Sequence, residues 1–308
     1  MNINSEEYIF LNQIIEEIKK ADKLHTKKII GNVEFLSKEY PGEYALLLKM
    51  IHSYFININY SPVKVAEDYL KMVRDMRKEG LYFYKHNEYC CKSQDIANQN
   101  VYSRPEIMSY YMSALLISQI LWKHHFCIFI YFKKRITDYF DEESTIKILD
   151  IGPGHGFFSF FIKETIPEFE SIDFVDISET SLAMTKKIIG ENDKLNYYLK
   201  DIFDFDESEK YDFIVLGEVL EHLDKPQDIL RKLARLLSDK GILWITTPTN
   251  SPALDHVYLF KTKEEVVDLI KECDLEVDNS VNYFAEDVTE EIALERRITN
   301  LVGLFCRK

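Results

Sequence analysis

The sequence has little of several features that mark particular classes of protein. Its 38 basic residues are outnumbered by 52 acidic ones, which gives a net charge of −14. This balance argues against broad binding to a nucleic-acid backbone, because such binding needs a dense basic face. The first residues lack the order of charged, apolar and small segments that defines a signal peptide. We therefore expect neither a nucleic-acid partner nor export.

Long uncharged apolar runs and regularly spaced cysteines are also missing. The most apolar helix-like run, around 117–132, is interrupted by Lys123, His124 and His125, so we expect no membrane span. The five cysteines are odd in number and have no zinc-like spacing. Reduced thiols are the simpler interpretation, and they predict a cytoplasmic protein.

What is present is enough apolar sequence to build a large core. Hydrophobic residues make up 46% of the 308 residues and aromatic residues 13%, which suits one large domain or two smaller ones. Residues 1–140 contain few glycines and many apolar residues at helical spacing, so we predict an all-helical region there. The expected helices are Glu6–Lys20, Pro41–Phe55, Pro62–Arg77 and Pro105–Tyr139, with an irregular stretch over Leu81–Ser103.

Residues 141–308 follow a different pattern, in which short apolar runs alternate with helices. We predict strands at Ile146–Ile151, Ile172–Val175, Tyr197–Leu199, Phe213–Leu216 and Ile242–Thr246. Between and after them we predict helices at Phe157–Thr165, Glu179–Ile189, Gln227–Leu237 and Lys263–Cys273. This alternation indicates parallel βαβ units in an α/β fold, with ligands at the carboxyl ends of the strands. The tail predicts two further strands, Glu276–Phe284 and Leu301–Cys306, as a closing antiparallel pair.

The glycine-rich stretch "DIGPGHG", residues 150–156, follows the first predicted strand. It lacks the Lys-Ser/Thr ending of a P-loop, and its glycines fall at alternate positions instead of the G-x-G-x-x-G spacing of a dinucleotide site. Asp150 lies two residues before the first glycine. A buried carboxylate there would repel a pyrophosphate but attract an ammonium group. The turn therefore suits a ligand with a positively charged amino-acid end.

Two more acidic residues end the next two predicted strands. Asp176 closes "SIDFVD" and can accept hydrogen bonds from both hydroxyls of a ribose. Asp201, in "YYLKDIFDF", could accept from an adenine amino group, with Ile202 packing on the ring. Either acid alone is commonly a solvated strand-end residue, but both occur here in order and at suitable spacing.

With these motifs in place, the chain resembles the class I S-adenosylmethionine-dependent methyltransferases. The matching stretches are "ILDIGPGHG", "DFVDIS", "LKDIFDF", "YDFIVLGEVLEHLDKP" and "LLSDKGILWITTPT", which occur in family order over Thr145–Lys308. The resemblance implies a Rossmann-like seven-stranded sheet whose last strand runs antiparallel, and S-adenosylmethionine as cofactor. The cofactor residues that it implies are Asp150, Gly152, Pro153, Gly154, Gly156, Asp176, Ile177, Asp201, Ile202, Gly217 and Glu218.

Methyl transfer needs an aligned acceptor and often a base. Two stretches could supply one. "GEVLEHL", after the fourth strand, offers Glu218 and His222, and "PTNSPALDHVYLF", after the fifth, offers His256. In many relatives, residues similar to those of "GEVLEHL" serve only as packing at the start of a helix. The second stretch is predicted to be a long loop that roofs the acceptor pocket, with Asn250 and Tyr258 as substrate contacts.

The same two stretches permit a metal site. Glu218, Glu221, His222 and His256 together resemble the ExxEH constellation of small-RNA 2′-O-methyltransferases, which use a divalent cation. The basic surface that an RNA substrate would need is not evident here. The metal is therefore an alternative to the catalytic interpretation of these residues.

The helical region is expected to act as a lid that selects the substrate. On a continuous helix, Tyr111 and His125 are fourteen residues apart and share a face, and Gln119 borders it. We predict that these three residues line the substrate chamber, with Tyr102, Tyr110 or Tyr111 closing over the cofactor. The plainer interpretation is that they are interfacial polar residues of a helical cap.

The sequence thus predicts transfer of a methyl group from S-adenosylmethionine to an oxygen, nitrogen or carbon atom, yielding S-adenosylhomocysteine. A small molecule or a natural-product or peptide intermediate is the expected acceptor. The alternatives are a protein or peptide methyltransferase and a non-catalytic protein that binds the cofactor. The oligomeric state is open, with a homodimer as one option.

Overall fold

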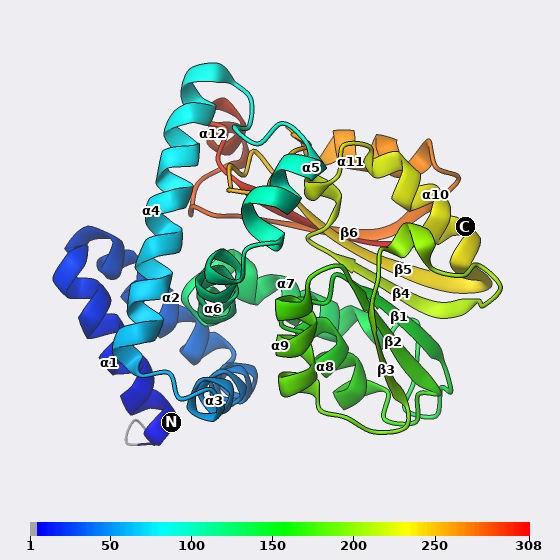
Figure 1. The fold of residues 1–308 in the computed structure, drawn as a ribbon, viewed down its shortest axis with the longest axis horizontal. Coiled ribbons are helices and arrows are strands. Elements are labelled where there is room, and N and C mark those ends of the chain that lie inside the picture. The colour runs from blue at the N-terminus through cyan, green and yellow to red at the C-terminus, as the bar shows by residue number, and fades with distance from the viewer. Residues whose placement is uncertain (1–4) are drawn as a thin grey trace.

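The computed structural model describes residues 5–308. A group of helices from the first half of the chain lies beside a seven-stranded sheet that is covered by helices on both faces (Figure 1). The N-terminal helices, coloured blue to cyan, lie at the end of the molecule away from the C-terminus.

The sheet has the strand order β3-β2-β1-β4-β5-β7-β6. The strands are β1 (Lys147–Ile151), β2 (Ser171–Asp176), β3 (Leu195–Leu199), β4 (Tyr211–Gly217), β5 (Leu237–Thr249), β6 (Glu276–Phe284) and β7 (Asn300–Arg307). Strands β1 to β5 pair in parallel, and β7 runs antiparallel to both β5 and β6. The predicted seven-stranded sheet with an antiparallel last strand is confirmed.

Helices cover both faces of this sheet, as the continuous apolar runs of its central strands require. On one face, α8 (Phe157–Thr165) and α9 (Glu179–Ile189) contribute to a core cluster with Phe213, Trp244 and Phe305 of the strands. The opposite cluster is built by α10 (Pro226–Leu236) and α11 (Lys263–Lys271). The short helix α12 (Glu290–Glu295) connects β6 to β7.

The first half of the chain is helical, as predicted. Its elements are α1 (Glu6–Ala21), α2 (Lys23–Glu39), α3 (Pro41–Asn57), α4 (Pro62–His86), α5 (Gln94–Ala97), the π-helical turn η1 (Asn98–Tyr102), α6 (Pro105–Leu121) and α7 (Lys123–Ile136). Helix α2 was not predicted. Helix α4 runs nine residues past the predicted end at Arg77, to His86, and is followed by Asn87, whose left-handed φ of 57° is common at helix ends.

The predicted single helix over Pro105–Tyr139 is wrong. The chain is extended at Trp122, and α6 and α7 meet there at 74°. Partners from other helices hold the break: the Trp122 indole N–H donates to the Tyr69 hydroxyl at 2.6 Å, and the Asn32 amide donates to the Leu121 carbonyl at 3.0 Å. Within residues 5–308, no helix by itself has the length and hydropathy of a membrane span; only this bent pair, taken together, reaches them.

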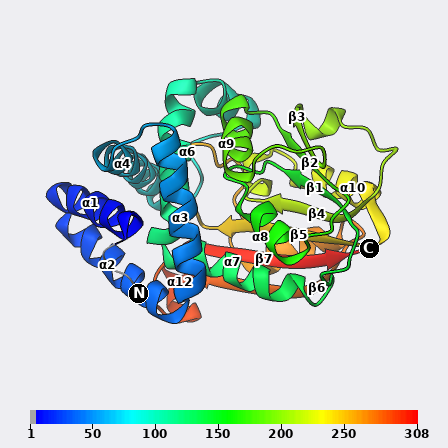
Figure 2. The same cartoon turned by 90° about the horizontal axis from the view of Figure 1, so that it is seen from below.

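Helix α7 packs directly on the sheet next to α8 (Figure 2). Phe132 stacks on Phe305 at 6.0 Å between ring centroids and lies 5.2 Å from Trp244. The core on this face is therefore continuous with the core of the N-terminal helices. Two polar pairs at the edge further fix this region against β6: the Tyr131 hydroxyl of α7 donates to Asn279, and the Tyr139 hydroxyl, just after α7, donates to Asp278. This packing sets the position of α6 over the carboxyl ends of the strands.

Candidate functional site

The glycine turn lies between β1 and α8, where the sequence placed it. Gly154 has φ of +59°, a left-handed conformation that residues with a side chain rarely adopt. Gly156 serves packing, because a Cβ there would come within 2.9 Å of Ile189 on α9. The turn therefore brings bare backbone to the end of β1 and lets α9 approach it.

Two buried carboxyl groups flank this turn at the ends of β1 and β2. Asp150 accepts a hydrogen bond from the Ser159 hydroxyl at 2.5 Å, and Asp176 accepts from the Ser178 backbone N–H at 2.8 Å and the Ser181 hydroxyl at 2.6 Å. Burial raises the pKa of Asp150 to about 7 and that of Asp176 to about 6. Their charged forms are thus costly unless a cation or further donors arrive.

Both carboxyl groups open on one cavity of about 270 Å³. Of the predicted cofactor residues, eight line it: Asp150, Gly152, Pro153, Gly154, Asp176, Ile177, Gly217 and Glu218. The other three lie outside the lining. Gly156 packs against α9, Asp201 caps the 3₁₀ turn η2 (Ile202–Asp204) by accepting from the Phe203 backbone N–H, and Ile202 is buried among apolar side chains. The roles predicted for these eleven residues stay predictions.

The helical region closes the cavity from the other side. One face of α6 carries five lining residues: Met108, Tyr111, Met112, Leu115 and Gln119. From α7 come His125, Ile128 and Phe129. The three predicted substrate residues of this region therefore do meet in one cavity. They meet because the chain bends at Trp122, which brings Gln119 Nε2 to 3.4 Å from His125 Nδ1, and not because they share a helix face.

Sequence reasoning missed the apolar part of this wall. Met108, Met112 and Leu115 lie on the same helical face as Tyr111, at spacings of three and four residues. That periodicity was available from the sequence, but it equally suits a helix packed in the core. His155, in the glycine turn, also lines the cavity, and burial lowers its pKa to about 3.

Two predicted substrate residues hold the loop after β5 and do not line the cavity. Asn250 has φ of +49°, and its side-chain amide donates to the Lys261 carbonyl at 2.7 Å. The Tyr258 ring packs on Phe260, with centroids 4.7 Å apart. In this structure, both residues contribute to the shape of the loop.

Glu221 lines the cavity from the other side of β1 than Asp176, on the 3₁₀ turn η3 (Leu220–His222) that follows β4. Its carboxyl group is fully buried, with Oε2 accepting from the Thr247 hydroxyl at 2.8 Å. Among the described residues, Oε1 has no hydrogen-bond partner. The Glu221 carbonyl accepts from the Val257 and Tyr258 backbone N–H groups at 2.8 and 2.9 Å, which ties the loop after β5 to η3.

Two histidines face this carboxyl group with their orientation fixed by backbone carbonyls. His222 Nδ1 lies 3.1 Å from the Asp255 carbonyl oxygen, and His256 Nδ1 lies 2.6 Å from that of Ser251. A carbonyl only accepts, so Nδ1 carries a hydrogen in both rings, and in the neutral form of each ring the lone pair is on Nε2. Burial lowers the pKa of His256 to about 4, so this imidazole is neutral at pH 7.

Asp255 connects this group to the helical region. Its carboxylate accepts from the Tyr111 hydroxyl at 3.1 Å and from the Tyr102 hydroxyl at 3.0 Å. All three residues line the cavity. The position of the loop that carries His256 is therefore linked to α6 and η1.

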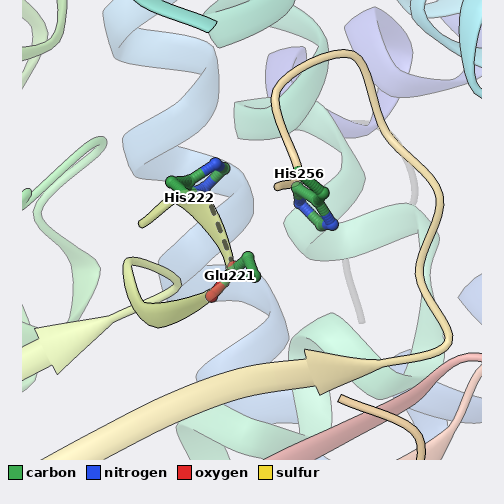
Figure 3. A group of neighbouring side chains, drawn as sticks. All are labelled: Glu221, His222 and His256. Atoms are coloured by element: carbon green, nitrogen blue, oxygen red, sulfur yellow. Dashed lines mark ion pairs between the residues drawn. The ribbon is translucent and has the colours of Figure 1, made fainter. Parts of the chain in front are cut away.

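Three of the four residues predicted as a possible metal set come together. Ligand atoms of Glu221, His222 and His256 lie within 4.8 Å of one another, and Figure 3 shows the two histidines on either side of the glutamate. Glu218 is not part of this group. It is buried on the cavity wall with φ of +55°, and its backbone N–H donates to the Thr246 carbonyl at 2.9 Å.

Comparison with known proteins agrees with this geometry. A family model described as "Methyltransferase domain" matches residues 121–278, just over half of the chain. The match begins at the break between α6 and α7. The chain therefore belongs to the class I S-adenosylmethionine-dependent methyltransferases, as the motifs implied.

Individual relatives match only part of the chain. Malonyl-[acyl-carrier protein] O-methyltransferase 2 of Ilyobacter polytropus is 31% identical over 107 residues, 35% of this chain and 41% of the relative. The mitochondrial ubiquinone biosynthesis O-methyltransferase of Candida albicans is 32% identical over 108 residues, 34% of this chain and 33% of the relative. The chain thus spans less than half the length of these two proteins.

Among solved structures, the mitomycin 7-O-methyltransferase MmcR is similar with a TM-score of 0.53. The similarity covers 80% of this chain and 72% of MmcR at 13% identity. It supports the fold of the chain and carries no information about its substrate.

Proposed function

We propose that the chain transfers a methyl group from S-adenosylmethionine to a small molecule or peptide intermediate, yielding S-adenosylhomocysteine. One observation carries this proposal: Asp150 and Asp176 line the same cavity as His222 and His256. A donor held by the first pair and an acceptor held by the second would therefore occupy one cavity.

The residues present fit this cofactor. The Asp150 carboxylate would neutralise the ammonium of its amino-acid end, and Asp176 would accept from ribose hydroxyls. The bare backbone of the glycine turn permits close approach of the amino-acid part. The cavity lining contains no lysine or arginine among residues 5–308, which suits a ligand with a positive sulfonium centre.

The cofactor supplies a methyl group activated by the positive sulfur. In the transfer, the methyl carbon–sulfur bond breaks while an acceptor lone pair forms the new bond, and sulfur keeps the electron pair. The acceptor proton leaves to a base in the cavity or to water. Glu218, His222 and His256 are the predicted catalytic residues, and the orientation of His256 by Ser251 presents a neutral Nε2 towards the cavity.

The enclosing wall favours a small acceptor over a folded polypeptide. Helices α6 and α7 supply an apolar surface of methionine, isoleucine and phenylalanine side chains opposite the polar ends of the strands. Such an apolar wall suits a partly apolar acceptor. The names of the two relatives given above both specify O-methyl transfer, so oxygen is the acceptor atom that we favour.

The test is incubation of the purified chain with methyl-labelled cofactor and fractionated small-molecule and peptide extracts. We expect the label to move to a small acceptor, with stoichiometric formation of S-adenosylhomocysteine. Label on intact proteins would instead identify a protein methyltransferase. Tight cofactor binding with no label on any acceptor would favour the non-catalytic alternative.

A further inference from the structure

The group of Glu221, His222 and His256 has the donor atoms of a transition-metal site. One carboxylate oxygen and two imidazole nitrogens lie within 4.8 Å of one another and come from η3 and the loop after β5 (Figure 3). Two histidines with one carboxylate suit zinc, iron, cobalt or manganese, and three protein ligands leave further coordination positions open.

The histidines are already oriented for ligation. Because Nδ1 of each ring donates to a carbonyl, Nε2 is the atom left with a lone pair. Metal-bound histidines commonly donate their other ring N–H to a carbonyl or carboxylate in this way, which fixes both tautomer and ring direction. The Asp255 and Ser251 carbonyls fill this supporting role here.

The Glu221 carboxylate is a second, independent indication. It is fully buried, and its Oε1 has no hydrogen-bond donor among the described residues. An unpartnered buried carboxylate oxygen destabilises the fold, because it has lost its hydrogen bonds to water and gained none in return. No lysine or arginine of the described chain lines the cavity to offset it, whereas Glu218 and Asp255 add further acidic groups. The polar atom paired with Oε1 is His222 Nε2 at 3.7 Å, which is beyond hydrogen-bond distance. A cation bound between these atoms would give both of them a direct partner.

We infer that Glu221, His222 and His256 bind a divalent metal ion whose open positions face the acceptor chamber. The ligands come from two segments that the Glu221 carbonyl ties together, so the site is assembled by the fold. Asp255, whose carboxylate accepts hydrogen bonds from the Tyr102 and Tyr111 hydroxyls, connects these two segments to the helical region.

The metal site also restricts the chemical class of the methyl acceptor, and this step rests on the proposed function. A divalent cation would bind an acceptor oxygen, lower the pKa of its hydroxyl and hold it towards the methyl group. The hydroxyl proton would then leave to water, and His222 and His256 would act as ligands instead of bases. The substrate class is an alcohol or phenol, with a second oxygen nearby as a possible further ligand.

The experiment uses the full chain, stripped with chelator and titrated with Zn²⁺ by calorimetry and with Co²⁺ by visible absorption. We expect one ion per chain and Co²⁺ bands of a site with nitrogen and oxygen ligands. His256→Ala and Glu221→Gln should each weaken binding roughly 10- to 100-fold or more. His125→Gln, a matched change of another cavity histidine, should leave metal affinity within about threefold.

Cofactor affinity of every sample is measured in parallel, both as a check of folding and to separate the two proposals. Wild-type chain that binds cofactor but no ion, or variants that bind the ion as tightly as wild type, would overturn the metal site and leave the proposed function intact. Wild-type chain that binds the ion but no cofactor would overturn the proposed function instead. If the ion binds only when His125 is intact, the site is elsewhere in the cavity and the assignment is wrong.

Discussion

The two ends of the cavity are built in different ways. At the cofactor end, Asp150 and Asp176 stand directly on strands, and their partners lie within nine residues along the chain. At the acceptor end, Asp255 meets Tyr111 and Tyr102 across 144 and 153 residues. The first end is a local property of βα turns, whereas the second exists only when the helical region is packed on the sheet. A mutation at one end should therefore change turnover and metal affinity or cofactor affinity, but not both.

The largest effect is expected from His256→Ala. Whether the residue is a metal ligand or a base, its removal should lower turnover by roughly 10²- to 10³-fold. Cofactor affinity, measured by calorimetry, should change by less than about twofold, because Asp150, Asp176 and the glycine turn are untouched. Equal loss of turnover and cofactor affinity would mean that the loop supports the whole cavity and that the ends are not separable.

The converse change is Asp176→Ala. Loss of two hydrogen bonds to a charged acceptor should weaken cofactor binding by about 100-fold. Gly154→Val should have a similar effect through its φ of +59°. In the same samples, Zn²⁺ affinity should stay within about threefold of wild type. Unchanged cofactor affinity in both variants would remove the cofactor assignment.

This difference between the ends also explains what the sequence could predict. Asp150 and the glycines follow an apolar strand and precede an amphipathic helix, so their place at the sheet edge follows from the local pattern. The break at Trp122 does not, because no proline or glycine marks it and its partner Tyr69 lies 53 residues away. The orientation of Asn250 could not be predicted from the local pattern either. Its backbone has a left-handed φ, and its side chain donates to the Lys261 carbonyl within the loop instead of lining the cavity.

The positions of the Asp201 and Ile202 side chains, whose predicted roles stay predictions, have a related physical cause. Their position after β3 was predicted well, since η2 begins there. Yet Asp201 caps its own turn, and Ile202 is only 7% exposed within the apolar core. Sequence order gives the strand end at which a residue lies, but not whether its side chain turns towards the ligand or towards a neighbouring backbone.

The pH dependence of cofactor binding tests the cofactor end alone. The pKa of about 7 for Asp150 and about 6 for Asp176 means that both are protonated at about pH 5.5, whereas the ligand needs them ionised. Affinity should therefore rise about tenfold or more from pH 5.5 to 8 and then level off. Calorimetry in buffers of different ionisation enthalpy should detect proton release on binding near pH 6.5.

The same shifts predict the stability of the cofactor-free chain. Both carboxyl groups have a folded pKa above the unfolded value near 4, so the unfolded chain releases these protons first as pH rises. Their contribution to the free energy of unfolding should thus decline from about pH 4 to 7, and cofactor should restore it. A thermal midpoint independent of pH over this range, with and without cofactor, would contradict the assigned burial of both groups.

The smallest effect is expected from Tyr111→Phe. The change removes one of two hydroxyl donors to Asp255 and keeps the ring that lines the cavity. One such bond contributes about 1–2 kcal/mol, so turnover should fall by roughly 5- to 30-fold. Because Asp255 supports His222 and not the cofactor, the loss should appear in turnover and in metal affinity, with cofactor affinity unchanged. Tyr110→Phe is the matched control, since the Tyr110 hydroxyl donates to Asp75 outside this network. If both variants behave alike, Asp255 does not transmit the packing of the helical region to the acceptor end.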